Sequence, residues 1–66
     1  MDAKDQLKVI NAGFTIIRSQ EFPTLRIKHK DKDHHEWTTL EKDFPSILQR
    51  DIRMQTLLLK PNYIAD

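Results

Sequence analysis

The chain has 66 residues, no cysteine and a formal net charge of +1. A chain of this length forms one domain, residues 1–66, whose small core gives it marginal stability. Its composition excludes disulfides and thiolate metal sites, and no apolar run approaches the roughly 20 residues that cross a bilayer. No signal-peptide pattern opens the sequence, so we expect a cytoplasmic protein with no membrane partner.

The first predicted element is a short helix over Ala3–Ala12. Apolar side chains recur in it at helical spacing, with Leu7 and Ile10 on one face. Asp2 has the residue type that caps helix N-termini. Gly13, the only glycine, follows the last helical residue. Glycine adopts positive φ without a Cβ penalty, so Gly13 fits the position just after the helix.

Two or three short β-strands are predicted next, over Phe14–Ser19, Thr24–Lys30 and His35–Leu40. The middle one alternates cleanly, and a period of two indicates a half-buried strand. Its two faces consist of Leu25, Ile27 and His29 on one side, and Arg26, Lys28 and Lys30 on the other. The residues from Asp31 to His34 break the alternation and predict a turn.

A second helix is predicted from Ser46 to about Leu59. Ser46 begins an S-x-x-Q capping box, and Pro61 disfavours helical backbone at the residue before it. Two apolar rows run along this helix, Ile47, Met54 and Leu58 in one and Leu48, Ile52 and Leu59 in the other. Such a wide apolar arc predicts a helix that covers the sheet and touches the first helix. The alternative is a homodimer or protein-interaction face made of Met54, Leu57 and Leu58.

The expected fold is therefore a small two-layer α+β domain of order α-β-β-(β)-α. Short connections favour an antiparallel sheet of two or three strands, with both helices on one face. Tyr63 and Ile64 in the tail are expected to fold back on the domain.

Four groups of residues carry a first resemblance: Ala12-Gly13-Phe14 with Arg18, Trp37-Thr38-Thr39-Leu40-Glu41-Lys42, Arg50-Asp51 and Leu57-Leu58. Together they resemble small uncharacterised proteins of bacterial conjugative elements. The likeness covers most of the chain and implies no biochemical activity. Such proteins favour small and basic residues near the start of the second helix, where this chain has Ile47 and Leu48.

The α-β-β-β-α order is also similar to double-stranded-RNA-binding domains and to the mRNA-cleaving toxins called HicA. Asn11-Ala12-Gly13-Phe14 followed by Ile17-Arg18-Ser19 looks like the start of the toxin pattern. That pattern implies a catalytic histidine soon afterwards, but no histidine precedes His29 here. The lysine cluster that RNA-binding domains place at the start of their last helix is also missing. Both likenesses therefore bear on fold more than on function.

The main candidate site is the basic row of the middle strand. Residues 24–32 carry a local charge of +3, because this segment contains four basic side chains and a single acidic one, Asp31. Cations at alternate strand positions stand roughly 7 Å apart, a spacing that can follow phosphates. The alternatives are a solvated face whose lysines protect the sheet from aggregation, or a site for acidic proteins. The candidate residues are Arg26, Lys28 and Lys30, with Arg18 and Lys32 beside them and Trp37 as a base-stacking aromatic.

A second candidate is the polar cluster Asp31, Asp33, His34, His35 and Glu36. Adjacent histidines in extended backbone diverge, and no H-x-x-x-H spacing occurs, so we predict a polar turn with no metal. A catalytic pair of His29 with Glu36 or Asp33 has no visible nucleophile or oxyanion site, so no enzyme is predicted. No cofactor or small-molecule ligand is expected. The sequence favours a binding or accessory module, with weak nucleic-acid binding as the leading hypothesis. The alternatives are a protein-interaction module or homodimer that uses the second helix and, more distantly, an RNA-cleaving toxin-like protein.

Overall fold

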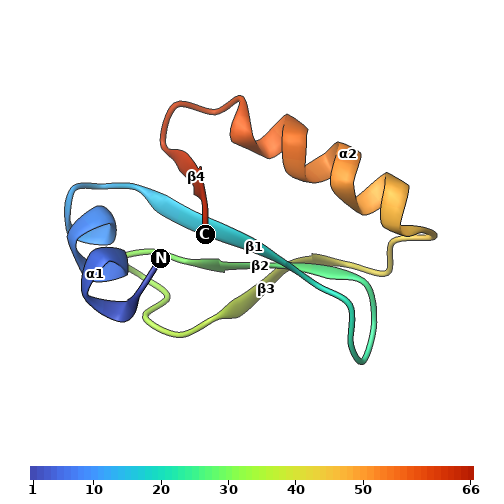
Figure 1. Cartoon of the computed structure of the whole chain (residues 1–66), viewed down its shortest axis with the longest axis horizontal. Helices are drawn as coiled ribbons and strands as arrows, with labels where there is room; N and C mark the ends of the chain where they lie inside the picture. Colours follow the sequence, from blue (N-terminus) through green and yellow to red (C-terminus); the bar gives the residue numbers. More distant parts are fainter.

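The computed structural model describes residues 1–66 as two helices and four strands in the order α1, β1, β2, β3, α2, β4 (Figure 1). The predicted α+β class is confirmed. Neither helix combines the length and the apolar content that a bilayer crossing requires. The helices are α1 Ala3–Asn11 and α2 Ile47–Leu58, and the strands are β1 Thr15–Gln20, β2 Arg26–Lys30, β3 Thr38–Lys42 and β4 Tyr63–Ala65.

Both helices begin at the predicted caps. The Asp2 carboxylate accepts a hydrogen bond from the Asp5 backbone N–H at 2.8 Å, and the Ser46 hydroxyl accepts one from the Gln49 N–H at 3.2 Å. Each bond satisfies an N–H that the first turn of a helix cannot pair internally. Gly13 has φ of +100°, which confirms its place after α1. These features depend on a few neighbouring residues, which is why the sequence reveals them.

The four strands form one mixed sheet in the order β3-β2-β1-β4. β1 and β2 are antiparallel, as are β2 and β3, but β4 runs parallel to β1 and pairs Thr15 with Tyr63. The prediction of a purely antiparallel sheet of two or three strands is therefore wrong. β4 has only three residues and becomes a strand because α2 returns the chain to the free edge of β1. The tail therefore folds back on the domain as predicted, by pairing as β4 with β1.

The third strand begins at Thr38, three residues later than predicted. The turn before it is closed by backbone hydrogen bonds between Asp31 and His34 in both directions. A β-bulge follows, in which Thr39 pairs with Lys28 while Glu41 pairs with Ile27. Leu40 is the extra residue, and a bulge re-aims side chains. Leu40 consequently packs against the hydrophobic core.

The main core lies between the sheet and α2. Ile17, Ile27 and Leu57 form its buried centre. Burial of an aliphatic side chain of this size stabilises the fold by about 1.5–3 kcal/mol before entropic costs. Five half-buried side chains complete this core: Leu40, Phe44, Met54, Leu58 and Tyr63.

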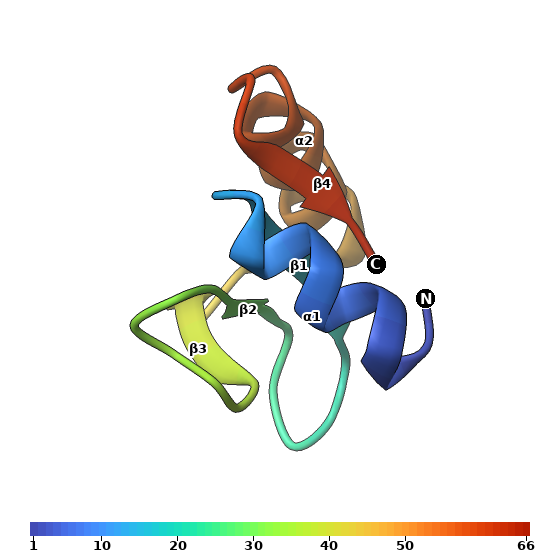
Figure 2. The ribbon, with the colours of Figure 1, turned by 90° about the vertical axis from the view of Figure 1, so that its left-hand side faces the viewer.

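The two helices lie on opposite faces of the sheet, so the prediction that they share a face is wrong. Ile16 and Ile17 are adjacent in β1 and both are 0% exposed. Neighbouring strand residues point to opposite faces, so each face needs its own cover. α1 packs against β1, and its Gln6 accepts a hydrogen bond from Lys30 on the face opposite Ile27. Figures 1 and 2 show α2 on one side of the sheet and α1 on the other.

Candidate functional site

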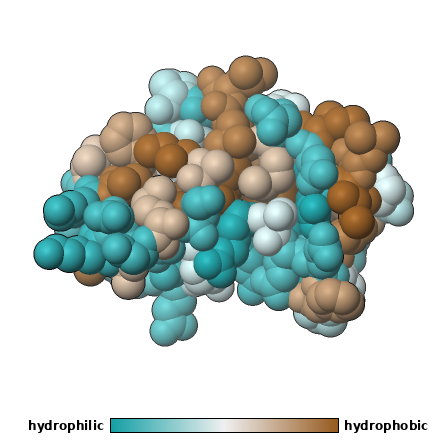
Figure 3. Space-filling view, in the orientation of Figure 1, coloured by the Kyte–Doolittle hydropathy of each residue, from teal (hydrophilic) through white to brown (hydrophobic).

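Four cations gather on the face of the sheet that α2 leaves uncovered. The β1–β2 register pairs Arg18 with Lys28, Gln20 with Arg26 and Ile16 with Lys30. Partners across an antiparallel ladder point to the same side, so these cations share one face. We call Arg18, Arg26, Lys28, Lys30 and Trp37 the basic face. The side of the molecule away from α2 is mostly hydrophilic (Figure 3).

Trp37 lies among these cations, and its side chain is not part of the main core. The guanidinium carbon of Arg18 stands 4.1 Å from the centre of the indole ring, and the Lys30 ammonium stands 5.0 Å from it. Both distances are within the range of cation–π attraction. Trp37 comes from the loop before β3, so its position depends on the β2–β3 turn. The half-buried ring joins β1, β2 and this loop into one surface.

Polar partners restrain three of the four cations. Arg18 donates to the Asp66 carboxylate at 3.2 Å. Arg26 donates to two threonine hydroxyls, and Lys30 donates to the Gln6 side-chain oxygen at 3.1 Å. Lys28 has neither a hydrogen-bond partner nor an ion-pair partner on its side chain. No pattern in the sequence indicates the roles of Gln6 and Asp66, because they lie 24 and 48 positions from Lys30 and Arg18 along the chain.

Carboxylates neutralise little of this surface. Arg18 is the only one of the four cations with a carboxylate oxygen within 4.0 Å, so Arg26, Lys28 and Lys30 keep unpaired charges. The guanidinium Nε of Arg26 is buried without a hydrogen-bond partner. Lys32, which the sequence added to this group, is exposed in the turn after β2 and makes no ion pair. The structure therefore leaves three unneutralised cations along β2.

A cavity of about 210 Å³ adjoins the Lys30 end of the basic face. It opens between α1 and the segment that follows β2. Lys30 is the only permanently charged side chain in its wall, so this hollow extends the positive surface toward α1. Its lining consists of Ala3, Gln6, Leu7, Ile10, Lys30 and His35.

The side chains predicted as an interaction face of α2 pack against the main core, with Leu57 buried and Met54 and Leu58 half-buried. Leu57 is 2% exposed, and Met54 and Leu58 pack against it in the main core. Leu57 is therefore closed to a partner in the folded monomer, whereas Met54 and Leu58 keep part of their surface exposed. The second apolar row is exposed instead, with Leu48 at 67%, Ile52 at 51% and Leu59 at 84%. Hydrophobic surface gathers over both ends of α2 in Figure 3.

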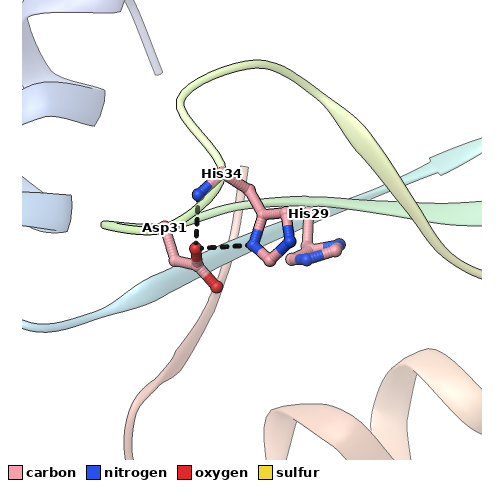
Figure 4. Close-up of side chains that lie close together, drawn as sticks. All are labelled: His29, Asp31 and His34. Carbon is pink, nitrogen blue, oxygen red and sulfur yellow. Dashed lines mark hydrogen bonds and ion pairs between the residues drawn. The ribbon is translucent and has the colours of Figure 1, made fainter.

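Two residues of the predicted polar turn, Asp31 and His34, lie close to His29 of β2. His29, Asp31 and His34 each place one ligand atom within 4.8 Å of the others (Figure 4). Asp33, His35 and Glu36 are not part of this group, and the suggested pairing of His29 with Glu36 or Asp33 does not form. The signal in the sequence is the spacing H-x-D-x-x-H, which combines the last turn of a strand with a tight turn.

Hydrogen bonds hold Asp31 and His34 together. One carboxylate oxygen of Asp31 accepts from the His34 Nδ1 and from the backbone N–H groups of Asp33 and His34, each at 2.9 Å. Burial raises the pKa of Asp31, but these hydrogen bonds and the attraction to His34 outweigh it, so the net pKa lies below its ordinary value. Asp31 is therefore a firmly ionised carboxylate at neutral pH.

Comparisons with known proteins leave the chain without a recognised relative. No family model, no curated protein and no solved structure matches it. No enzyme family is thus identified, and the likeness to conjugative-element proteins and to HicA toxins remains a resemblance of residues and element order.

Proposed function

We propose that this domain binds single-stranded nucleic acid through its basic face. The observation that carries the proposal is the row of Arg26, Lys28 and Lys30, none of which has a carboxylate within 4.0 Å. Alternate residues of a strand are roughly 7 Å apart, which is close to the spacing of successive phosphates in an extended strand. The row therefore offers one cation to each of about three phosphates.

Trp37 supports a single strand over a duplex. Flexible single strands expose their bases, which stack on aromatic rings and on arginine planes. Here the Arg18 guanidinium lies over the indole at 4.1 Å, so the two groups form one layered platform. A base that stacks on this platform keeps its phosphate near Lys28, which has no protein partner. A duplex hides its bases and gains only the phosphate contacts.

The expected affinity is low. About three phosphate contacts to a single strand give a slope of log affinity against log salt near −2. That electrostatic contribution is small, so we expect a dissociation constant in the micromolar range or weaker at physiological salt. Arg26 and Lys30 already make hydrogen bonds inside the protein. These bonds have to weaken when the same groups bind phosphate, which lowers the net gain in binding free energy.

The test is a titration of the full chain with labelled single- and double-stranded RNA and DNA at about 50 mM salt, repeated at higher salt. Trp37 is the only tryptophan, so its fluorescence reports binding at the basic face. Arg26→Gln, Lys28→Gln and Lys30→Gln are combined in one variant. Lys4→Gln, Lys8→Gln and Lys60→Gln form the matched control, with the same loss of charge elsewhere.

Binding that survives in the control and disappears in the β2 variant supports the proposal. Equal weakening in both variants indicates unspecific attraction by total charge. Absence of any shift in the amide resonances of residues 24–32 with all four oligonucleotides overturns the proposal and leaves acidic proteins as partners to pursue. Circular dichroism confirms that each variant is folded before its binding is compared.

A second candidate function is self-association through the exposed row of α2. Leu48, Ile52 and Leu59 lie within about 40° of one another on the helix and point away from the sheet, by the 3.6-residue helical period. Their exposed fractions, all above half, favour this row over the buried one that the sequence suggested. Ultracentrifugation across a concentration series tests it. A concentration-dependent dimer that Leu48→Glu dissociates supports it, and a monomer at all concentrations refutes it.

A further inference from the structure

The turn that follows β2 gathers donors of the kind that transition metals prefer. His29 lies near the end of β2, Asp31 follows the strand, and His34 closes the turn. One nitrogen from each imidazole and one carboxylate oxygen lie within 4.8 Å of one another. We propose that His29, Asp31 and His34 bind a divalent transition-metal ion, with Zn²⁺ as the best-fitting candidate.

His29 provides an independent argument. It is only 7% exposed, and its Nδ1 stands 2.9 Å from the carbonyl oxygen of Thr38. A carbonyl oxygen can only accept, so Nδ1 carries the proton and Nε2 keeps its lone pair. That Nε2 makes no hydrogen bond within the protein. A buried imidazole whose second nitrogen donates to a backbone carbonyl is the usual orientation of a metal-binding histidine.

The other two donors are also positioned before any metal binds. Asp31 is held by two backbone N–H groups and by His34, all through the same carboxylate oxygen. Its second oxygen makes no hydrogen bond. The His29 and His34 rings lie 4.5 Å apart, and Figure 4 shows His34 between Asp31 and His29. The donors therefore come from one six-residue stretch, His29 to His34, and require no distant segment to approach.

The donor set selects the class of metal. Two imidazoles with one carboxylate suit zinc and its neighbours, whereas calcium and magnesium require mainly oxygen ligands. Zinc bonds of about 2.0–2.2 Å place tetrahedral ligands roughly 3.4 Å apart. Donors that lie up to 4.8 Å apart therefore need to close by up to about 1.4 Å. His34 is partly exposed and can move that far. Three protein ligands leave the fourth position for water.

Such an ion would fix the turn that positions Trp37, three residues after His34. It would also stabilise the folded state by mass action, because the unfolded chain does not hold the donors together. Neither effect depends on nucleic acid, so metal binding and nucleic-acid binding are tested independently of each other.

The experiment is a calorimetric titration of the untagged, metal-free chain with zinc chloride near neutral pH. We expect one Zn²⁺ per chain with a micromolar dissociation constant. His34→Ala should weaken binding by about tenfold or more, by analogy with the cost of losing metal-site partners. His35→Ala is the matched control, because His35 is adjacent and exposed but lies outside the cluster, and it should keep wild-type affinity.

Nitrogen NMR of the imidazoles gives a second measurement on the wild-type chain, which no folding defect affects. Zinc should shift the resonances of His29 and His34 and leave those of His35 in place. Absence of heat and of imidazole shifts at about 1 mM zinc overturns the proposal, as does equal affinity of His34→Ala and wild type. Shifts confined to His35 also overturn it.

Discussion

The Arg18 guanidinium lies over the Trp37 ring, with its central carbon 4.1 Å from the ring centre. This contact links β1 to the loop that precedes β3, although β2 separates the two strands in the sheet. Arg18 also donates to Asp66, beyond the end of β4. One side chain thereby connects three segments that are far apart in the sequence.

The first prediction concerns this contact. Arg18→Ala and Trp37→Ala should each lower the free energy of unfolding, and a double-mutant cycle should give a coupling of about 0.5–1 kcal/mol for a partly exposed cation–π pair. Chemical denaturation of the four proteins measures it. Arg18→Lys keeps the charge and should retain part of the coupling. Strict additivity of the two alanine substitutions would show that the contact contributes nothing.

A second prediction follows from the backbone at Gly13. Its φ of +100° lies in the region that side chains with a Cβ disfavour, and no atom would meet an added Cβ within 4 Å. Gly13→Val should therefore destabilise the domain by about 1–3 kcal/mol through backbone strain alone. Gly13→Asn should cost less, because asparagine tolerates positive φ. A denaturation midpoint for Gly13→Val equal to that of wild type would contradict the assignment.

The third prediction concerns Asp31 and pH. Its pKa is lowered in the folded state, so its contribution to stability is present above the unfolded pKa and is lost as pH falls through the folded pKa. Asp31→Asn should thus be less stable than wild type at neutral pH, and the difference should vanish in acid. Urea denaturation with a chelator present, from pH 7 downward, measures this. A difference that grows on acidification would refute it.

Two adjacent isoleucines give a fourth prediction. Ile16 and Ile17 are both fully buried but lie under different helices. Ile16→Ala and Ile17→Ala should each destabilise the fold by about 2–5 kcal/mol, since each leaves a cavity in its own layer. Gln55→Ala at an exposed position of α2 is the control and should change stability by less than about 0.5 kcal/mol. A negligible effect of Ile16→Ala would mean that α1 does not cover that face.

Local sequence determined the helix caps, the glycine after α1 and the alternation of β2. Asp2, Ser46 and Gly13 act through neighbours only a few residues away, so no knowledge of the rest of the chain is needed. The sequence also predicts that the cations of β2 share one face, because alternate residues of a strand point to the same side whatever surrounds the strand. The grouping of His29, Asp31 and His34 can also be predicted from local sequence, since all three residues lie in one short stretch.

Tertiary structure alone decided which face each helix covers and which segments become neighbours. The adjacent apolar pair Ile16 and Ile17 indicated a strand covered on both sides, but it did not indicate by which element. β4 is a strand only beside β1, and Trp37 lies on the basic face only because the Asp31–His34 turn brings it to Arg18. These pairings join residues 19 to 48 positions apart, and their free energy comes from surface that is buried only when the whole chain has folded.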